Sequence, residues 1–62
     1  MLNVMVVLVT QGPPRELGPR QSPSLPRIGE CFTMAPDGSG QAYRVEAVDK
    51  TARPVNVYVV PA

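Results

Sequence analysis

Five prolines fall between residues 11 and 30, in the segment QGPPRELGPRQSPSLPRIGE, and they constrain this chain more than any other feature. Each proline fixes φ and removes a backbone hydrogen-bond donor, so regular hydrogen-bonded structure is not expected to run through the segment. The sequence therefore predicts a long proline-rich loop over residues 11–29. Regular elements are expected only before and after it.

The residues outside this loop have the pattern of strands. Residues 2–10 are rich in valine and apolar on both faces, and the Gly-Pro-Pro that follows favours a strand over a helix. Residues 30–35 and 41–49 flank the turn sequence PDGSG, which predicts a hairpin. Residues 54–60, with alternating valines, supply a last strand.

The second arm of the hairpin shows which of its faces is packed. Tyr43, Val45 and Ala47 alternate with Arg44 and Glu46. Side chains of a strand point alternately to its two faces, so this pattern is typical of a strand with one face packed and one in water. Glu46 is expected to pair with a cross-strand cation such as Lys50 or Arg44.

These strands predict an all-β domain that spans residues 1–62. The expected architecture is a small four-stranded antiparallel sheet, curled into an SH3-like, partly open barrel with the long proline-rich loop between its first two strands. The first strand is expected to lie antiparallel to the last. A flat open sheet is the alternative, but it would leave the doubly apolar first strand exposed on one face.

The small size of the chain predicts that it needs a partner. A domain of 62 residues buries only about 60% of the surface that its unfolded chain exposes. The single cysteine, Cys31, excludes an intrachain disulfide. Stability is therefore expected to come in part from association, either with another protein or as a homodimer through the first strand or a sheet edge.

The side chains predict no catalysis, no cofactor and no metal site. The chain has no histidine, its carboxylates are scattered, and Cys31 has no neighbour in the sequence to activate it, so it is interpreted as a small buried hydrophobe. The net charge of +1 gives no long-range field toward nucleic acid or a membrane. Without a targeting signal or a membrane-spanning stretch, the expected location is the cytoplasm.

Two short motifs resemble a known group of proteins. The run LPRIGECF, the strand AYRVEAV and the alternating valines of VNVYVV are similar to the pattern of short uncharacterised bacterial and phage β proteins, which carry an LPR(I/V)GE box. The resemblance covers about the last forty residues of the chain. It implies that Ile28 packs into the core and that Gly29 permits the bend into the next strand, and it implies no activity.

The residues predicted to contact a partner all lie in the proline-rich segment: Arg15, Leu17, Arg20, Leu25 and Arg27. Prolines lower the ordering cost of a loop, and arginine is favoured at interfaces. The other interpretation is that the two leucines fold back to cap an open end of the sheet.

Two functions follow as hypotheses. The favoured one is a non-enzymatic protein-binding module, such as a small accessory or regulatory protein, for example one of phage type. The alternative is a small barrel that binds nucleic acid weakly, with arginines on the phosphates and with Phe32, Tyr43 and Tyr58 stacking on bases.

Overall fold

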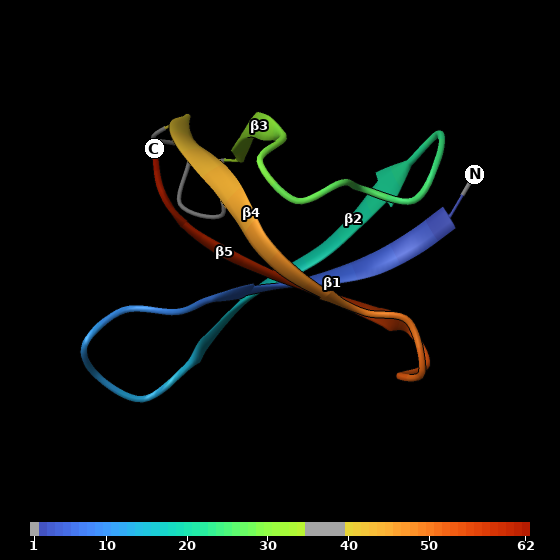
Figure 1. Cartoon of the computed structure of the whole chain (residues 1–62), viewed down its shortest axis with the longest axis horizontal. Helices are drawn as coiled ribbons and strands as arrows, with labels where there is room; N and C mark the ends of the chain where they lie inside the picture. The colour runs from blue at the N-terminus through green and yellow to red at the C-terminus, as the bar shows by residue number, and fades with distance from the viewer. Residues whose placement is uncertain (1, 35–39) are drawn as a thin grey trace.

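A computed structural model describes residues 2–34 and 40–62, and within them the chain is all-β. Its strands are β1 (Leu2–Leu8), β2 (Arg15–Ser22), β3 (Cys31–Met34), β4 (Gln41–Asp49) and β5 (Val55–Pro61). They form one sheet in the order β2-β1-β5-β4-β3, which twists and curls into a half-barrel (Figure 1). The predicted all-β, curled architecture is confirmed, whereas the SH3-like character of the curl stays a prediction.

The prediction of an uninterrupted loop over residues 11–29 is wrong, because β2 lies inside it. β2 pairs antiparallel with β1, from Leu2 opposite Ser22 to Leu8 opposite Arg15. Because β2 is an edge strand, the missing N–H of Pro19 leaves no gap in the sheet. The other four prolines of the segment lie in the turn before β2 or in the stretch after it, so they mark the ends of the strand.

The prediction of four antiparallel strands is also wrong, because β1 and β5 pair in parallel, from Val4 opposite Val55 to Leu8 opposite Val59. The extra strand explains this result. Each strand reverses the direction of the one before it, so the first and fifth strands run the same way. Since β1 and β5 are neighbours at the centre of the sheet, they pair in parallel. β1 therefore has both of its edges paired within its own chain.

The core lies on the inner face of the curl and is built mainly from valines. The buried cluster consists of Val4, Val6, Tyr43, Val45, Val57 and Val59. The expectation that Ala47 belongs to this face is wrong: a bulge between Val45 and Ala47 leaves Ala47 exposed and packs Val48 against the core instead. A cluster of one tyrosine and five valines is a small core.

The predicted hairpin between β3 and β4 is confirmed by its pairing, from Cys31 opposite Arg44 to Met34 opposite Gln41. The predicted turn residues Asp37 and Gly38 lie outside the described residues. Gly40 has a φ of 71°, a value that glycine adopts readily. In residues 2–34 and 40–62, no helix has the length and apolar character to cross a membrane.

Candidate functional site

The structure separates the five residues that were predicted to contact a partner. Arg15, Leu17 and Arg20 lie on β2, whereas Leu25 and Arg27 lie in the segment between β2 and β3. Arg15 and Arg27 are exposed, and the other three are half-buried. The pairing of β2 with β1 therefore divides the set, because it draws the first three residues into the sheet.

Leu17, on β2, packs against the core. The pairing of β1 with β2 shifts between Val6, opposite Gly18, and Val7, opposite Glu16, so Leu17 is the extra residue of a bulge. A bulge turns a side chain away from the regular alternation of the strand, and here it directs an apolar side chain inward. Leu17 is therefore a structural residue.

Arg20 spans the distance between the two edge strands of the sheet. Its Nη1 donates a hydrogen bond of 3.2 Å to the carbonyl oxygen of Thr33 on β3. Its guanidinium carbon also lies 4.4 Å from the centroid of the Phe32 ring, in cation–π geometry. Arg20 is thus held by β3 and is not a free arm for a protein partner.

Two neighbouring grooves form a candidate binding surface, which we call the end surface. One has a volume of about 560 Å³ and includes Leu25, Arg27 and Ile28 in its lining, and the other, of about 470 Å³, includes Leu2 and Arg53. The grooves share Leu25 and Lys50, so they are continuous. In Figure 1 the start of β1, the segment after β2 and the β4–β5 connection lie on the same side of the molecule.

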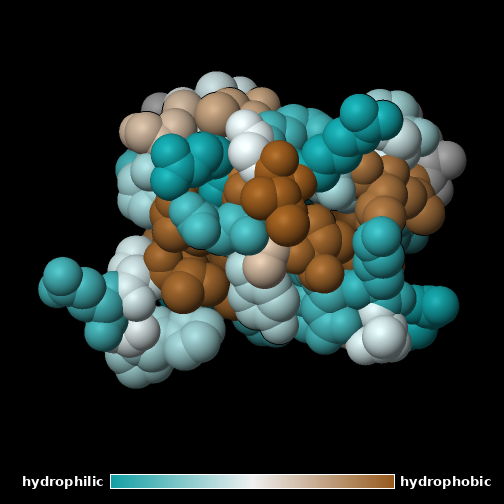
Figure 2. Space-filling view, in the orientation of Figure 1, coloured by the Kyte–Doolittle hydropathy of each residue, from teal (hydrophilic) through white to brown (hydrophobic). Residues whose placement is uncertain are grey.

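Apolar side chains are accessible on the end surface. Ile28 is 72% exposed and Leu2 is 38% exposed. The expectation that Ile28 packs into the core is therefore wrong. Its neighbour Gly29 has a φ of 90°, so the bend predicted there does require glycine, and the turn holds Ile28 in water. Figure 2 shows apolar residues at the surface of this view, bordered by hydrophilic ones.

The charge of the end surface is positive. Arg27, Lys50 and Arg53 are exposed in its lining, and no carboxylate of residues 2–34 and 40–62 lines either groove. Arg53 Nη1 donates hydrogen bonds to the carbonyl oxygens of Lys50 (2.8 Å) and Ala52 (3.0 Å), which orders the β4–β5 connection. The end surface therefore combines apolar groups with cations and is suited to a ligand that is apolar and acidic.

Asp49 organises the start of the same β4–β5 connection. Its Oδ1 accepts hydrogen bonds from the Thr51 hydroxyl (2.7 Å) and from the Thr51 backbone N–H (3.0 Å). These bonds, the hydroxyl first, hold the pKa of the Asp49 carboxyl below its ordinary value. The charged carboxylate is therefore favoured by the fold.

We expect stability to depend on pH through Asp49. Because its pKa is lower in the folded state, its stabilising effect is fully present above the unfolded pKa of about 4 and is lost as the pH falls through the folded value. Asp49→Asn cannot titrate. The difference in melting temperature between the natural protein and Asp49→Asn should be constant above about pH 5 and shrink as the pH approaches about 2. A difference that stays constant over this whole range would contradict the assignment.

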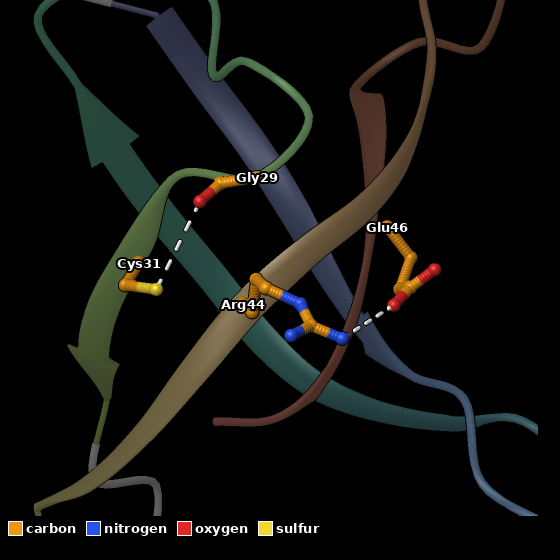
Figure 3. Close-up of polar contacts among 4 residues, drawn as sticks. All are labelled: Gly29, Cys31, Arg44 and Glu46. Atoms are coloured by element: carbon orange, nitrogen blue, oxygen red, sulfur yellow. Dashed lines mark hydrogen bonds and ion pairs between the residues drawn. The ribbon is translucent and has the colours of Figure 1, made fainter.

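Cys31 and the ion pair of Arg44 with Glu46 lie outside this surface. Cys31 is exposed, which corrects its interpretation as a buried hydrophobe, and its thiol points to the Gly29 carbonyl oxygen at 3.9 Å (Figure 3). The predicted pair of Arg44 with Glu46 is present at 3.0 Å. Both of these side chains are half exposed, so the pair contributes at most about 1 kcal/mol. In the part of the chain that the structure describes, no group of three potential ligands could hold a metal ion.

Two of the three aromatic residues considered for base stacking are not available for it. Tyr43 is only 5% exposed and belongs to the core cluster. Phe32 is half-buried, and the Arg20 guanidinium lies over its ring. Single-stranded nucleic acid binds through exposed aromatic faces, so this arrangement does not favour stacking on bases.

Sequence reasoning found two members of the end surface, Leu25 and Arg27, and missed the others. Ile28 carried a usable signal, because a large apolar residue between Arg27 and a bend-forming glycine has no strand face to join. No local signal indicates Leu2, which reaches the surface only through the pairing of its strand with β2.

Comparisons of the chain with protein-family models, with curated proteins and with solved structures found no match. The geometry of the end surface is therefore the basis on which a function can be proposed.

Proposed function

We propose that this protein is a non-enzymatic binding module whose end surface docks an extended segment of a partner protein. The segment carries a large apolar side chain next to acidic residues. One observation carries the proposal: the exposed Ile28 and Leu25 line adjoining grooves in which every charged lining residue that the structure describes is a cation.

The apolar part of the surface supplies the affinity in this proposal. Exposed apolar groups that gather in a groove mark interaction sites on small soluble proteins. The turn exposes the apolar side chain of Ile28 to water, which is unfavourable in the free protein. A partner that covers this side chain gains the free energy of burying it. The segment after β2 and the β4–β5 connection both lie at strand ends, where recognition residues commonly sit.

In this proposal the cations orient the bound segment and select an acidic partner over a basic one. Arg27, Lys50 and Arg53 surround the apolar groups, so a partner with carboxylates at its rim is attracted and a basic one is repelled. A module of this size offers one docking surface to a larger assembly, which suits an accessory or regulatory protein of the cytoplasm. Self-association remains a second proposal, through the unpaired edges of β2 or β3.

The test is selection from a random peptide library displayed on phage, followed by binding measurements on the enriched peptide. We expect enriched peptides to contain a large apolar residue flanked by aspartate or glutamate. Ile28→Ser should lower the affinity for the enriched peptide at least about tenfold, which corresponds to about 1.4 kcal/mol of binding free energy. Because Ile28 is exposed, the melting temperature should stay within a few degrees of the natural value.

The matched control is Arg44→Gln, which removes an exposed cation from β4, outside both grooves. Its peptide affinity should be unchanged, whereas Lys50→Gln should weaken binding and reduce its dependence on salt. Enrichment of basic or purely polar peptides would contradict the proposal. Tight, salt-dependent binding of single-stranded DNA that needs Lys50 would instead favour the nucleic-acid alternative.

A further inference from the structure

The sheet has an open seam, and one side chain crosses it. β2 and β3 are the two edges of the sheet, and the described strands show no pairing between them. Arg20 from β2 reaches β3 through the Thr33 carbonyl oxygen and the Phe32 ring. The edges also approach at Gly18, where an added Cβ would lie 3.9 Å from Met34 Cε. Side-chain contacts therefore connect β2 and β3 where backbone hydrogen bonds do not.

A pocket of about 230 Å³ lies behind this seam. Val4, Val6 and Val57 of the core lie under its floor and expose at most 1% of their surface, so Pro23 and Pro26 supply the apolar floor that is open to a ligand. Phe32 and Arg20 form walls at the seam. An apolar cavity of about 150 Å³ in another protein takes up benzene, so the pocket has room for a phenyl ring or a branched aliphatic chain. Its floor is suited to an apolar group.

The guanidinium of Arg20 gives this pocket a cation with neutral partners only. Its contacts are a carbonyl oxygen and an aromatic ring, and within residues 2–34 and 40–62 no carboxylate forms an ion pair with it. Glu30 also lines the pocket, but its Oε2 accepts a hydrogen bond of 3.3 Å from the Arg27 backbone N–H. A half-buried guanidinium binds a carboxylate more strongly than a neutral acceptor, because the bond is charge-assisted.

We propose that the seam pocket binds a small monocarboxylic acid with an aromatic or branched apolar group. The carboxylate pairs with Arg20, and the apolar group lies against Phe32 and the two prolines of the floor. The carboxylate takes over the guanidinium hydrogen bond that Thr33 now accepts, so the two edges stay connected through the ligand. This pocket adjoins the end surface, since Ser24 and Pro26 line both, but its cation is Arg20, which lines neither groove of the end surface, so the proposal does not depend on peptide binding.

Titration of the natural protein with phenylacetate, followed by amide and methyl resonances in two-dimensional NMR, tests this proposal. We expect saturable shifts that are largest for Val4, Val57 and the residues of β3, with a dissociation constant below about 10 mM. Phenylacetamide has the same shape without the charge, so it should bind at least about tenfold more weakly. This comparison needs no variant and is independent of any effect on folding.

Variants on β2 locate the cation. Arg20→Gln should lower the affinity for phenylacetate at least about tenfold. The control Arg15→Gln, on the same strand and outside the pocket, should bind phenylacetate with the affinity of the natural protein. Equal affinity for phenylacetate and its amide would overturn the proposal. So would the absence of saturation at about 10 mM, or shifts centred on Arg27 and Lys50 of the end surface.

Discussion

Replacing Val6 with alanine is expected to lower the free energy of unfolding by about 2–3 kcal/mol, because two buried methyl groups are lost and the surrounding strands cannot close the cavity fully. Val6 is completely buried and lies between Gly18 of β2 and Val57 of β5. A chain of 62 residues has a total stability of roughly 3–9 kcal/mol, so the loss is a large part of it. The melting temperature should fall by about 10–20 °C.

The control for this experiment is Val9→Ala, which makes the same change just after the end of β1, where the side chain is 37% exposed. Its cost should be below about 1 kcal/mol, because much of the side chain already contacts water. Thermal melts followed by circular dichroism measure both variants. Equal losses at the two positions would mean that Val6 is not in the core of the folded protein.

Replacing Val57 with proline is expected to abolish the cooperative unfolding transition. Proline keeps most of the apolar volume but removes an N–H, and β5 lies between β1 and β4, so an N–H on either of its sides has a strand to bond to. An acceptor left unpaired in the core costs about 1–3 kcal/mol, in addition to the misfit of the ring. A core of this size supplies only about 3–5 kcal/mol in total.

Gln21→Pro is the matched control on the edge strand. Successive N–H groups of a strand point to opposite sides, so Gln21 directs its N–H to the same side as the Pro19 nitrogen, away from β1. This substitution should cost no more than about 1 kcal/mol and leave the melt cooperative. If Gln21→Pro unfolds the protein while Val57→Pro does not, the strand order is wrong.

The hairpin and the ends of most strands could be predicted from the sequence because their signals are local. The alternation from Tyr43 to Glu46 indicates which side chains lie on each face of β4. Gly29 has a positive φ, which other residues rarely adopt. The bounds of β4 and the start of β1 match the prediction; the end of β1 differs by two residues, and both ends of β3 and of β5 differ by one.

The candidate site could be predicted only in part, because the five chosen residues were treated as one loop. Pairing with β1 places Arg20 at the seam and Leu17 against the core, whereas Leu25 and Arg27 remain at the end surface. Membership of that surface depends on which segments meet at the end of the half-barrel. Leu2 and Lys50 are distant in sequence from Leu25 and line a groove with it only in the folded chain.

By itself, the sequence determined that this protein is built from strands, because valine-rich runs and turn residues act through local sterics and side-chain alternation. Only the tertiary structure decided whether a proline-containing segment could be a strand. Proline has no backbone N–H, and this donor is needed for hydrogen bonds in the middle of a sheet but not at its outer edge. Pro19 can therefore lie in a strand because β2 is at the edge of the sheet. With β2 the sheet has five strands, and β1 and β5 therefore run in the same direction and pair in parallel. The edges β2 and β3 are connected by the side chain of Arg20.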